Sequence, residues 1–340
     1  MILEKYLNYI LTLLLFIFLV SCNTTQKLTT KEKRITTLMN NQTHWKNYYV
    51  IESDTNEIEK QLKQSSFISD RDTFQLIYFE SNKDAPNILI SQGSGGHAYV
   101  FAELGYLIHT KGYNVFIMPK HGGNSITKLM KRQSDALLYI SSNFSDRIGI
   151  YSEGLGGFVT FYLSLTQGAF KSAVYQNAPA ILTDSEFRKA AIQGKTKIIF
   201  PFAKLLFKIS SDTKIPISSY LNWEKLIDPI EPSHTIESRL VKEGYLHDPD
   251  FDKKYPLSAI MSLMTTPPPK PLSELNIPTM FMVAKRGFGG IKYENYLKSL
   301  FNRLPMTTKR LTEVDGSVYW MLSHPKYAST VICEWFDETL

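Results

Sequence analysis

Residues 148–165 join a short apolar run to an apolar helix through a glycine-rich turn, and this arrangement restricts the possible folds. A short run that is apolar throughout indicates a strand buried on both faces, as in a parallel sheet covered by helices. The turn contains Ser152, Glu153, Gly154, Leu155, Gly156 and Gly157. At its centre, Gly154 adopts unusual backbone conformations at little cost because it has no side chain. The segment is therefore suited to a sharp reversal from strand to helix.

Apolar runs alternate with helical patterns along most of the chain. The sequence predicts strands that begin near residues 87, 113, 147, 171, 277 and 308, and helices at 126–143, 155–165, 293–303 and 325–338. This alternation predicts an α/β domain over residues 46–340, with a mostly parallel central sheet covered by helices on both faces. Between residues 181 and 276 the alternation stops and prolines are frequent, which indicates an insertion.

The order and spacing of these motifs resemble the α/β-hydrolase superfamily, in particular its esterases and lipases, over roughly residues 70–340. In that family the strand–turn–helix carries the pattern G-x-S-x-G, with the nucleophilic serine at the apex of the turn. The resemblance implies that residues 181–276 form a helical cap over the mouth of the active site. It also implies an oxyanion-like pocket lined by Gly93, Ser94, Gly95 and Leu155.

The three positions that the family uses for catalysis hold residues without catalytic groups. A serine hydrolase needs a nucleophile, a base that takes its proton, and an acid that orients the base. The matching positions in this sequence are Gly154, Gly287 and Val318. We therefore expect a non-catalytic protein that binds a small apolar or acyl ligand, or a protein partner. Tight packing of the cap against residues 93–96 would indicate a closed pocket and favour a function of the surface.

An active carboxylic-ester or lipid hydrolase with relocated residues is the alternative. Its nucleophile would be Ser152 or Ser94, and its base would be His324 or His97. Such a pair needs a hydroxyl–imidazole contact near ~3 Å. Ser152 precedes the apex by two residues, so we expect its side chain to be buried in the sheet, and we expect His324 to open the last helix. A role of Glu153 as an acid or nucleophile is a further possibility.

The N-terminus resembles the signal peptide of a bacterial lipoprotein. Residues 1–21 contain Lys5 followed by an apolar stretch at 7–20, which is short for a membrane span. Leu-Val-Ser precedes Cys22, and in lipoproteins such a cysteine carries acyl chains such as palmitate. The polar residues 22–45 are expected to be a tether. The resemblance implies anchoring of Cys22 in a membrane of the bacterial cell envelope, which is the outer membrane if the cell is Gram-negative.

Composition argues against several other classes. Lys and Arg total 38 and Asp and Glu total 32, so the net charge of +6 is modest. A basic patch with interleaved aromatic residues does not stand out, so we expect no nucleic-acid partner. Of the two cysteines, Cys22 is expected to be lipidated, which leaves Cys333 without an internal disulfide partner. The sequence has no phosphate-loop, dinucleotide or His/Cys metal-binding pattern, so no cofactor and no metal are expected.

Overall fold

The computed structural model describes residues 45–121, 125–166, 168–191, 213–216, 244–245, 248–286 and 290–340. These residues belong to one compact unit, Trp45–Leu340. The expected signal peptide, Cys22 and nearly all of the expected tether lie outside the described residues, as does Gly287. Of the helices that are described, none is both long enough and apolar enough to span a membrane.

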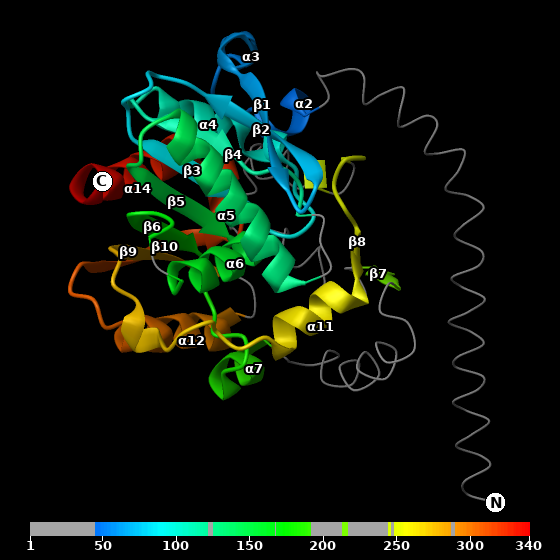
Figure 1. Ribbon diagram of the computed structural model, residues 1–340, viewed down its shortest axis with the longest axis vertical. Helices are drawn as coiled ribbons and strands as arrows, with labels where there is room; N and C mark the ends of the chain where they lie inside the picture. The colour runs from blue at the N-terminus through cyan, green and yellow to red at the C-terminus, as the bar shows by residue number, and fades with distance from the viewer. Residues whose placement is uncertain are drawn as a thin grey trace, which may run out of the picture. The chain divides into compact units, whose positions relative to one another are not determined.

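An eight-stranded sheet forms the centre of the unit (Figure 1). Its strand order is β1-β2-β4-β3-β5-β6-β9-β10. The strand β2 is antiparallel to both of its neighbours, and all other neighbouring strands are parallel, which confirms the predicted mostly parallel sheet. The strands are β1 (Lys63–Ser69), β2 (Asp72–Phe79), β3 (Asn87–Ser91), β4 (Asn114–Ile117), β5 (Ile148–Glu153), β6 (Ser172–Gln176), β9 (Thr279–Arg286) and β10 (Lys309–Ser317).

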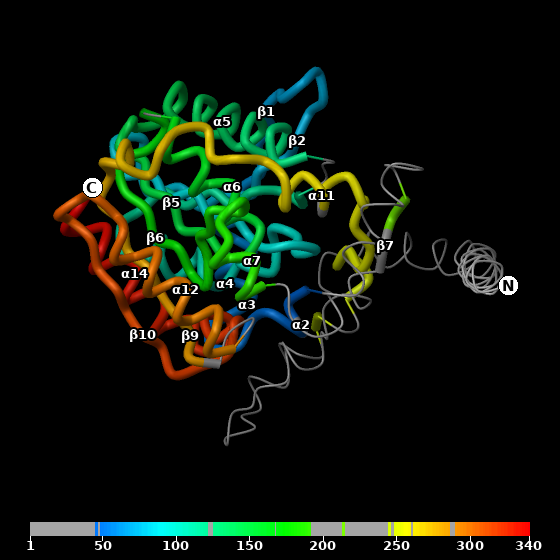
Figure 2. The backbone as a smooth tube through the Cα atoms, turned by 90° about the horizontal axis from the view of Figure 1, so that it is seen from below, coloured from blue at the N-terminus to red at the C-terminus, as the bar shows by residue number. Residues whose placement is uncertain are grey.

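Helices lie on both faces of this sheet, and Figure 2 shows them together with the two sheet edges, β1 and β10. Most of them follow a strand, as expected for crossovers between parallel strands. The helices are α2 (Lys46–Tyr49), α3 (Thr55–Gln61), η1 (Ala98–Phe101), α4 (Ala102–His109), α5 (Ile126–Asn143), α6 (Gly154–Ser164), α7 (Ser185–Ala191), α11 (Leu257–Thr265), η3 (Leu272–Glu274), α12 (Gly290–Arg303), α13 (Trp320–Ser323) and α14 (Pro325–Thr339).

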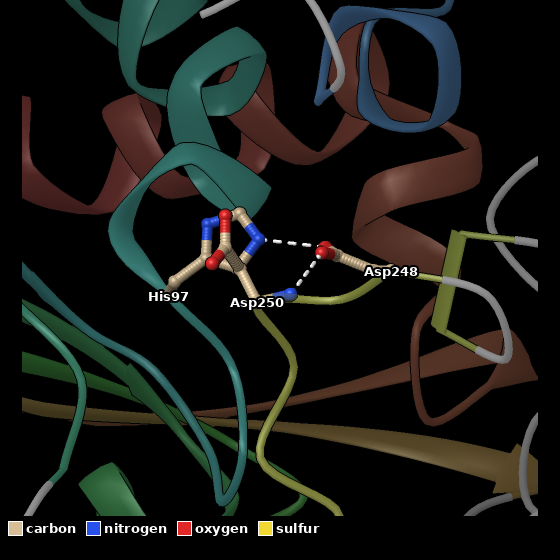
Figure 3. A group of neighbouring side chains, drawn as sticks. All are labelled: His97, Asp248 and Asp250. Carbon is tan, nitrogen blue, oxygen red and sulfur yellow. Dashed lines mark hydrogen bonds and ion pairs between the residues drawn. The ribbon is translucent and has the colours of Figure 1, made fainter. Parts of the chain in front are cut away.

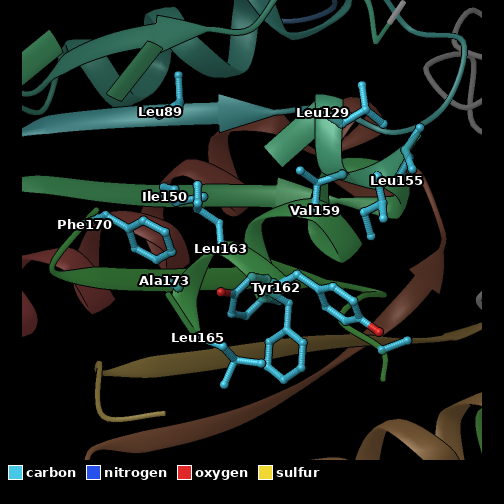
Figure 4. Close-up of a cluster of buried hydrophobic side chains, with 14 of the residues drawn as sticks. Leu89, Leu129, Ile150, Leu155, Val159, Tyr162, Leu163, Leu165, Phe170 and Ala173 are labelled. Atoms are coloured by element: carbon cyan, nitrogen blue, oxygen red, sulfur yellow. The ribbon is translucent and has the colours of Figure 1, made fainter. Parts of the chain in front are cut away.

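Two apolar cores, one on each face of the sheet, hold these layers together. Because successive side chains of a strand point to opposite faces, Leu89 belongs to one core and its neighbours Ile88 and Ile90 belong to the other. The first core joins the sheet to α5, α6 and α12, and part of it is drawn in Figure 4. The second core joins the sheet to α4 and α14. The strands between them are buried on both faces, so their apolar runs carried a strong signal in the sequence.

The hairpin formed by β1 and β2 was not predicted. Its first strand is mostly exposed and polar, with only Phe67 and Ser69 buried. The turn between the strands uses Asp70 and Arg71, which both have a positive φ (50° and 73°). Such turns favour asparagine or aspartate followed by glycine, and Arg71 stands where the glycine is usual, so the hairpin signal is incomplete.

The region between β6 and β9 contains the stretch that the sequence predicts to be an insertion, and the structure describes only parts of it. Its described parts include α7, α11 and a small antiparallel pair, β7 (Lys214–Pro216) and β8 (Lys254–Pro256). We call this region the insertion. Its residues 248–256 lead into α11 and lie close to the loop that follows β3, where the candidate site is found.

Candidate functional site

The turn from β5 into α6 has the geometry of a nucleophile elbow. Gly154 stands at its apex with φ of +50°, in the left-handed region that glycine tolerates best. Gly156 lets the start of α6 approach the end of β3. A Cβ atom there would come under 3.0 Å from the carbonyl oxygens of Ser91 and Gln92, closer than real Cβ contacts. The amide of Gly156 donates to the Gln92 carbonyl at 3.1 Å, so the elbow is fastened directly to the neighbouring strand.

The loop after β3 lies directly against the apex of this elbow. A Cβ atom on Gly154 would lie 3.2 Å from the Cα of Gly93, a contact that requires the loop to shift by a few tenths of an ångström. The amide of Gly93 donates a hydrogen bond to the carboxylate of Glu153, the residue just before the apex. The Glu153 carboxylate is thus the hydrogen-bond partner of the Gly93 amide. This amide belongs to the loop whose sequence resembles the oxyanion loop of the hydrolases.

Glu153 is a buried acid, with 3% of its surface exposed. Burial raises its pKa to about 7, although the hydrogen bond from the Gly93 amide lowers the pKa in part. Burial also raises the pKa of Tyr245 and of Tyr319 well above the usual tyrosine value, and the negative charge of Glu153 adds to both increases. The carboxyl group therefore changes its charge near neutral pH, inside the protein and next to two tyrosines.

The insertion covers the same loop from the other side. The amide of Gly95 donates to the hydroxyl of Tyr255 at 3.0 Å, and the amide of Asp252 donates to the Gly95 carbonyl at 2.9 Å. Gly95 has φ of +84°, and a Cβ atom there would meet the Asp252 carbonyl at 2.7 Å and the Phe251 ring at 2.8 Å. The hydroxyl of Ser94 also bonds with Tyr255. Residues 251–255 are therefore in tight contact with the loop.

His97 ends this loop and binds the insertion through a buried carboxylate. Its Nε2 donates to Oδ2 of Asp248 at 2.6 Å, and the same oxygen accepts from the hydroxyl of Tyr49 at 2.9 Å. The amide of Asp250 donates to the other oxygen, Oδ1, at 2.8 Å. Burial alone would raise the pKa of Asp248, but these hydrogen bonds and the His97 ring outweigh it and lower the pKa. The carboxylate therefore stays ionised. Figure 3 shows its hydrogen bonds with the His97 ring and the Asp250 amide.

The serine candidates bond to groups other than imidazole. Ser152 is fully buried and its hydroxyl pairs with that of Thr160 at 2.8 Å, on the side of α6. Ser94 pairs with Tyr255. Among the described residues, neither hydroxyl forms a hydrogen bond with a histidine ring.

The candidates His324 and His97, and one further histidine, His121, each bond to a group other than a candidate serine. His324 is exposed between α13 and α14, with its Nδ1 3.2 Å from the hydroxyl of Ser323. His121 is buried, and its Nε2 donates to the carbonyl of Gln92. Burial lowers the pKa of His121 to about 4, so this ring is neutral at neutral pH. Of the two candidates, His97 is the one that lies in the loop after β3, and its Nε2 is already bonded to Asp248.

The loop after β10, where the family places its base, is held by side-chain amides. Val318 is buried, and its carbonyl accepts hydrogen bonds from Gln176 at 3.0 Å and from Asn177 at 3.5 Å. Asn177 also accepts a hydrogen bond from the amide of Ala284 at 2.8 Å, at the end of β9. Sequence reasoning missed these amides, although their position directly after an apolar strand, at the carboxyl edge of a parallel sheet, was an available signal.

Sequence reasoning also missed the contacts that the insertion makes. Tyr255 and Asp248 lie in a stretch without regular strand–helix alternation, and their partners Gly95 and His97 are 160 and 151 residues away. Only the fold brings such positions together. A buried acid inside the elbow is equally hard to recognise, because acidic residues in turns are usually exposed.

Comparison with proteins of known structure identifies the fold. No family model and no curated protein matches the sequence. Among solved structures, the monoglyceride lipase from Saccharomyces cerevisiae is similar with a TM-score of 0.63 and 11% identity, over 86% of this chain and 97% of the lipase chain. The monoacylglycerol lipase from Paleococcus ferrophilus has a TM-score of 0.57 and 17% identity, over 81% and 98%.

An epoxide hydrolase from Vigna radiata is also similar, with a TM-score of 0.54 and 10% identity, over 82% of this chain and 99% of that chain. Structural similarity at such low sequence identity indicates a shared fold and does not indicate a shared activity. Together with the strand order of the sheet and the elbow between β5 and α6, these likenesses identify the architecture of this chain as the α/β-hydrolase fold.

Proposed function

We propose that this chain is a non-catalytic protein of the α/β-hydrolase fold, anchored through lipidated Cys22 to the bacterial cell envelope, where it binds a protein partner. The observation that carries the proposal is Gly154 at the apex of the elbow with the Gly93 loop against it. A serine hydrolase needs a nucleophile at this apex and a free amide in the facing loop for the oxyanion. Here the apex residue has no side chain, and the Gly93 amide is bonded to Glu153.

The contacts of the other candidate residues support a protein without hydrolase activity. A relocated serine needs an imidazole within hydrogen-bond distance to take its proton. Ser152 instead bonds to Thr160 inside the sheet–helix layer, and Ser94 bonds to Tyr255. Val318 occupies the position expected for the catalytic base, and it offers Gln176 a backbone carbonyl in place of an imidazole. An ester or lipid hydrolase with relocated residues is therefore the weaker candidate.

The packing of the insertion favours a protein partner over a small ligand. Residues 251–255 contact Gly95 so closely that even a methyl group there would clash with Phe251 and Asp252. An acyl ligand would need space between this segment and the loop. A protein partner needs only the outer surface. A small apolar or acyl ligand remains the competing outcome of the experiments below.

Absence of activity is tested with the full-length chain in detergent. The protein is incubated with a fluorophosphonate probe and with p-nitrophenyl esters of short and medium chain length, beside Gly154→Ser. We expect no labelling and no ester turnover above buffer for either protein, since the variant regains a hydroxyl but no base. Labelling that maps to Ser94 or Ser152, with turnover lost on replacement by alanine, would overturn the proposal.

Binding is tested in the cells that make the protein. Chemical cross-linking of the full-length chain is compared with extraction of lipids from the purified protein. We expect a cross-linked species of defined mass and no lipid at a stoichiometric amount. One molecule of an acyl lipid per chain, with no cross-linked protein, would refute the partner and identify a ligand-binding function instead.

A further inference from the structure

The N-terminal segment of the domain contacts both sides of the candidate site. We call residues 45–53 the strap; it contains α2 and the residues that follow this helix. Two of its aromatic side chains are buried, since Trp45 is 6% exposed and Tyr49 is 2% exposed. The expected tether, residues 22–45, runs directly into the strap. The strap therefore connects the tether with the folded domain.

One end of the strap is fixed to the body of the domain. The carboxylate of Glu103, on α4, accepts hydrogen bonds at 2.7, 2.8 and 2.6 Å from the successive amides of Ile51, Glu52 and Ser53. Glu103 is 2% exposed, and hydrogen bonds to a carboxylate are stronger than those between neutral groups. Breaking them would leave a buried carboxylate without these partners, which is costly. This end of the strap therefore stays in place.

The other end of the strap contacts the insertion. The hydroxyl of Tyr49 donates to Oδ2 of Asp248 at 2.9 Å, and the Tyr49 ring lies edge-on to that of Tyr245 with the ring centroids 6.0 Å apart. Gly244 packs against the strap without space for a side chain. A Cβ atom there would lie 2.7 Å from the Cβ of Tyr48 and 2.9 Å from the Tyr49 ring. The strap thus binds a segment that lies far from it in sequence.

The same end of the strap contacts the loop after β3 and the short helix η1. The Tyr49 ring lies edge-on to the His97 ring with the centroids 5.9 Å apart, and Trp45 stacks on Tyr99 at 5.3 Å. The Nε2 atom of His97 forms a hydrogen bond with the same oxygen of Asp248 that accepts from Tyr49. The Asp248 carboxylate is therefore the point at which the strap, the loop and the insertion meet.

We propose that the strap is a conformational latch. Residues 45–49 detach while residues 51–53 stay bound to Glu103, and this detachment lets residues 248–255 of the insertion move away from the loop after β3. When Tyr49 leaves, Asp248 keeps its hydrogen bonds with His97 and with the Asp250 amide, so no buried carboxylate loses all its partners. Because the tether continues from the end that detaches, the latch couples the tether to closure of the site. The latch requires neither catalysis nor lipidation of Cys22.

The latch is tested by native-state hydrogen exchange of the full-length chain in detergent, at urea concentrations below the unfolding transition. Mass spectrometry with fragmentation of the peptides resolves single amides. Tyr49→Phe removes the hydroxyl that bonds Asp248 and keeps the ring, so this variant is expected to fold. Gly244→Ala acts from the insertion, because its methyl group would displace the strap. Glu52→Gln is the matched control, since Glu52 lies in the strap but directs its carboxylate to Lys326 at 3.3 Å.

In the wild type we expect two classes of amides. Those of Tyr49, Gly95 and Asp252, which bond to Trp45, Tyr255 and Gly95, should exchange through a local opening that depends little on urea. The amides of β5 and of residues 51–53 should exchange more slowly and with a strong urea dependence, through global unfolding.

The variants should change the local opening. We expect exchange at Gly95 and Asp252 to become about tenfold faster in Tyr49→Phe, because the closed state loses one hydrogen bond to a charged group. Gly244→Ala should increase exchange at the same amides by at least as much, since it removes more of the contact between the strap and the insertion. Glu52→Gln should leave exchange at these amides unchanged.

Three results would overturn the proposal. The first is exchange at Gly95 and Asp252 with the same urea dependence as in β5, which would make the strap, the insertion and the sheet one cooperative unit. The second is unchanged exchange at these amides in Tyr49→Phe, and the third is an equal effect of Glu52→Gln. In each case the strap does not act as a latch. Circular dichroism shows whether each variant is folded, and Tyr49→Phe decides the question if Gly244→Ala does not fold.

Discussion

Two adjacent residues, Glu153 and Gly154, determine what the elbow can do. The glycine leaves the apex without a reactive group, and the acid before it bonds to the amide of Gly93. The sequence indicated the first of these features directly, because the spacing of the glycines marks the apex. The second depends on a side-chain direction that only the packing of β3 against β5 determines.

The raised pKa of Glu153 leads to a prediction about stability. An unperturbed glutamate has a pKa of 4.5, and burial raises that of Glu153 to about 7 in the folded protein. The folded state thus binds the proton more tightly than the unfolded state. The resulting stabilisation is complete below the unfolded pKa and is lost as the pH rises through the folded pKa. Glu153→Gln, which stays neutral, should therefore be more stable than the wild type at alkaline pH.

The expected difference grows with pH to roughly 3 kcal/mol near pH ~8 and is small near pH ~4. Urea unfolding of both proteins across this range measures it. Glu57→Gln serves as the control, because Glu57 is half-exposed on α3 and its replacement should alter stability little at any pH. A difference between the wild type and Glu153→Gln that does not depend on pH would contradict the assigned burial of the charge.

At the scale of elements, the fold depends on close approaches between strands, helices and the insertion. We expect Gly156→Ala to destabilise the protein by about 3 kcal/mol or more, because the new Cβ would press on two backbone carbonyls of β3 and its following loop. Gly112→Ala is the control. Gly112 has φ of +100° and open space around it, so it tests backbone strain alone, at about 1 kcal/mol. Equal losses in chemical denaturation would refute the close-approach explanation.

The contact between the insertion and the loop gives a second prediction at this scale. Tyr255→Phe removes the hydroxyl that accepts from the Gly95 amide and bonds Ser94. We expect a loss of about 1–2 kcal/mol in the free energy of unfolding and faster hydrogen exchange at Gly95, because a buried amide loses its partner. Tyr327→Phe, at an exposed tyrosine on α14, should leave both quantities unchanged. Unchanged exchange at Gly95 in Tyr255→Phe would show that the hydroxyl does not hold the loop.

Elements differed in how far the sequence predicted them. The strands β3, β5 and β6 are buried on both faces, so their apolar runs were sufficient. The polar edge strand β1 gave no such signal. The sequence also did not predict how the N-terminal segment is held. The buried carboxylate of Glu103 accepts hydrogen bonds from the successive amides of Ile51, Glu52 and Ser53. Such a clamp needs a partner about 50 residues away, and no local pattern encodes it.

For the whole molecule, the resemblance of the N-terminus to a lipoprotein signal leads to the last prediction. The chain has two cysteines, which makes a matched comparison possible. Cys22→Ser should abolish incorporation of labelled palmitate and shift the protein from the membrane fraction to the soluble fraction, because the acyl chains provide the anchor. Cys333→Ser is the control. Cys333 is buried in α14, and burial raises the pKa of its thiol to about 12, so it is an unreactive thiol. Labelled palmitate that persists in Cys22→Ser would show that the chain is not acylated at this cysteine. That result would refute the proposed membrane anchor and would leave the proposals for the folded domain unaffected.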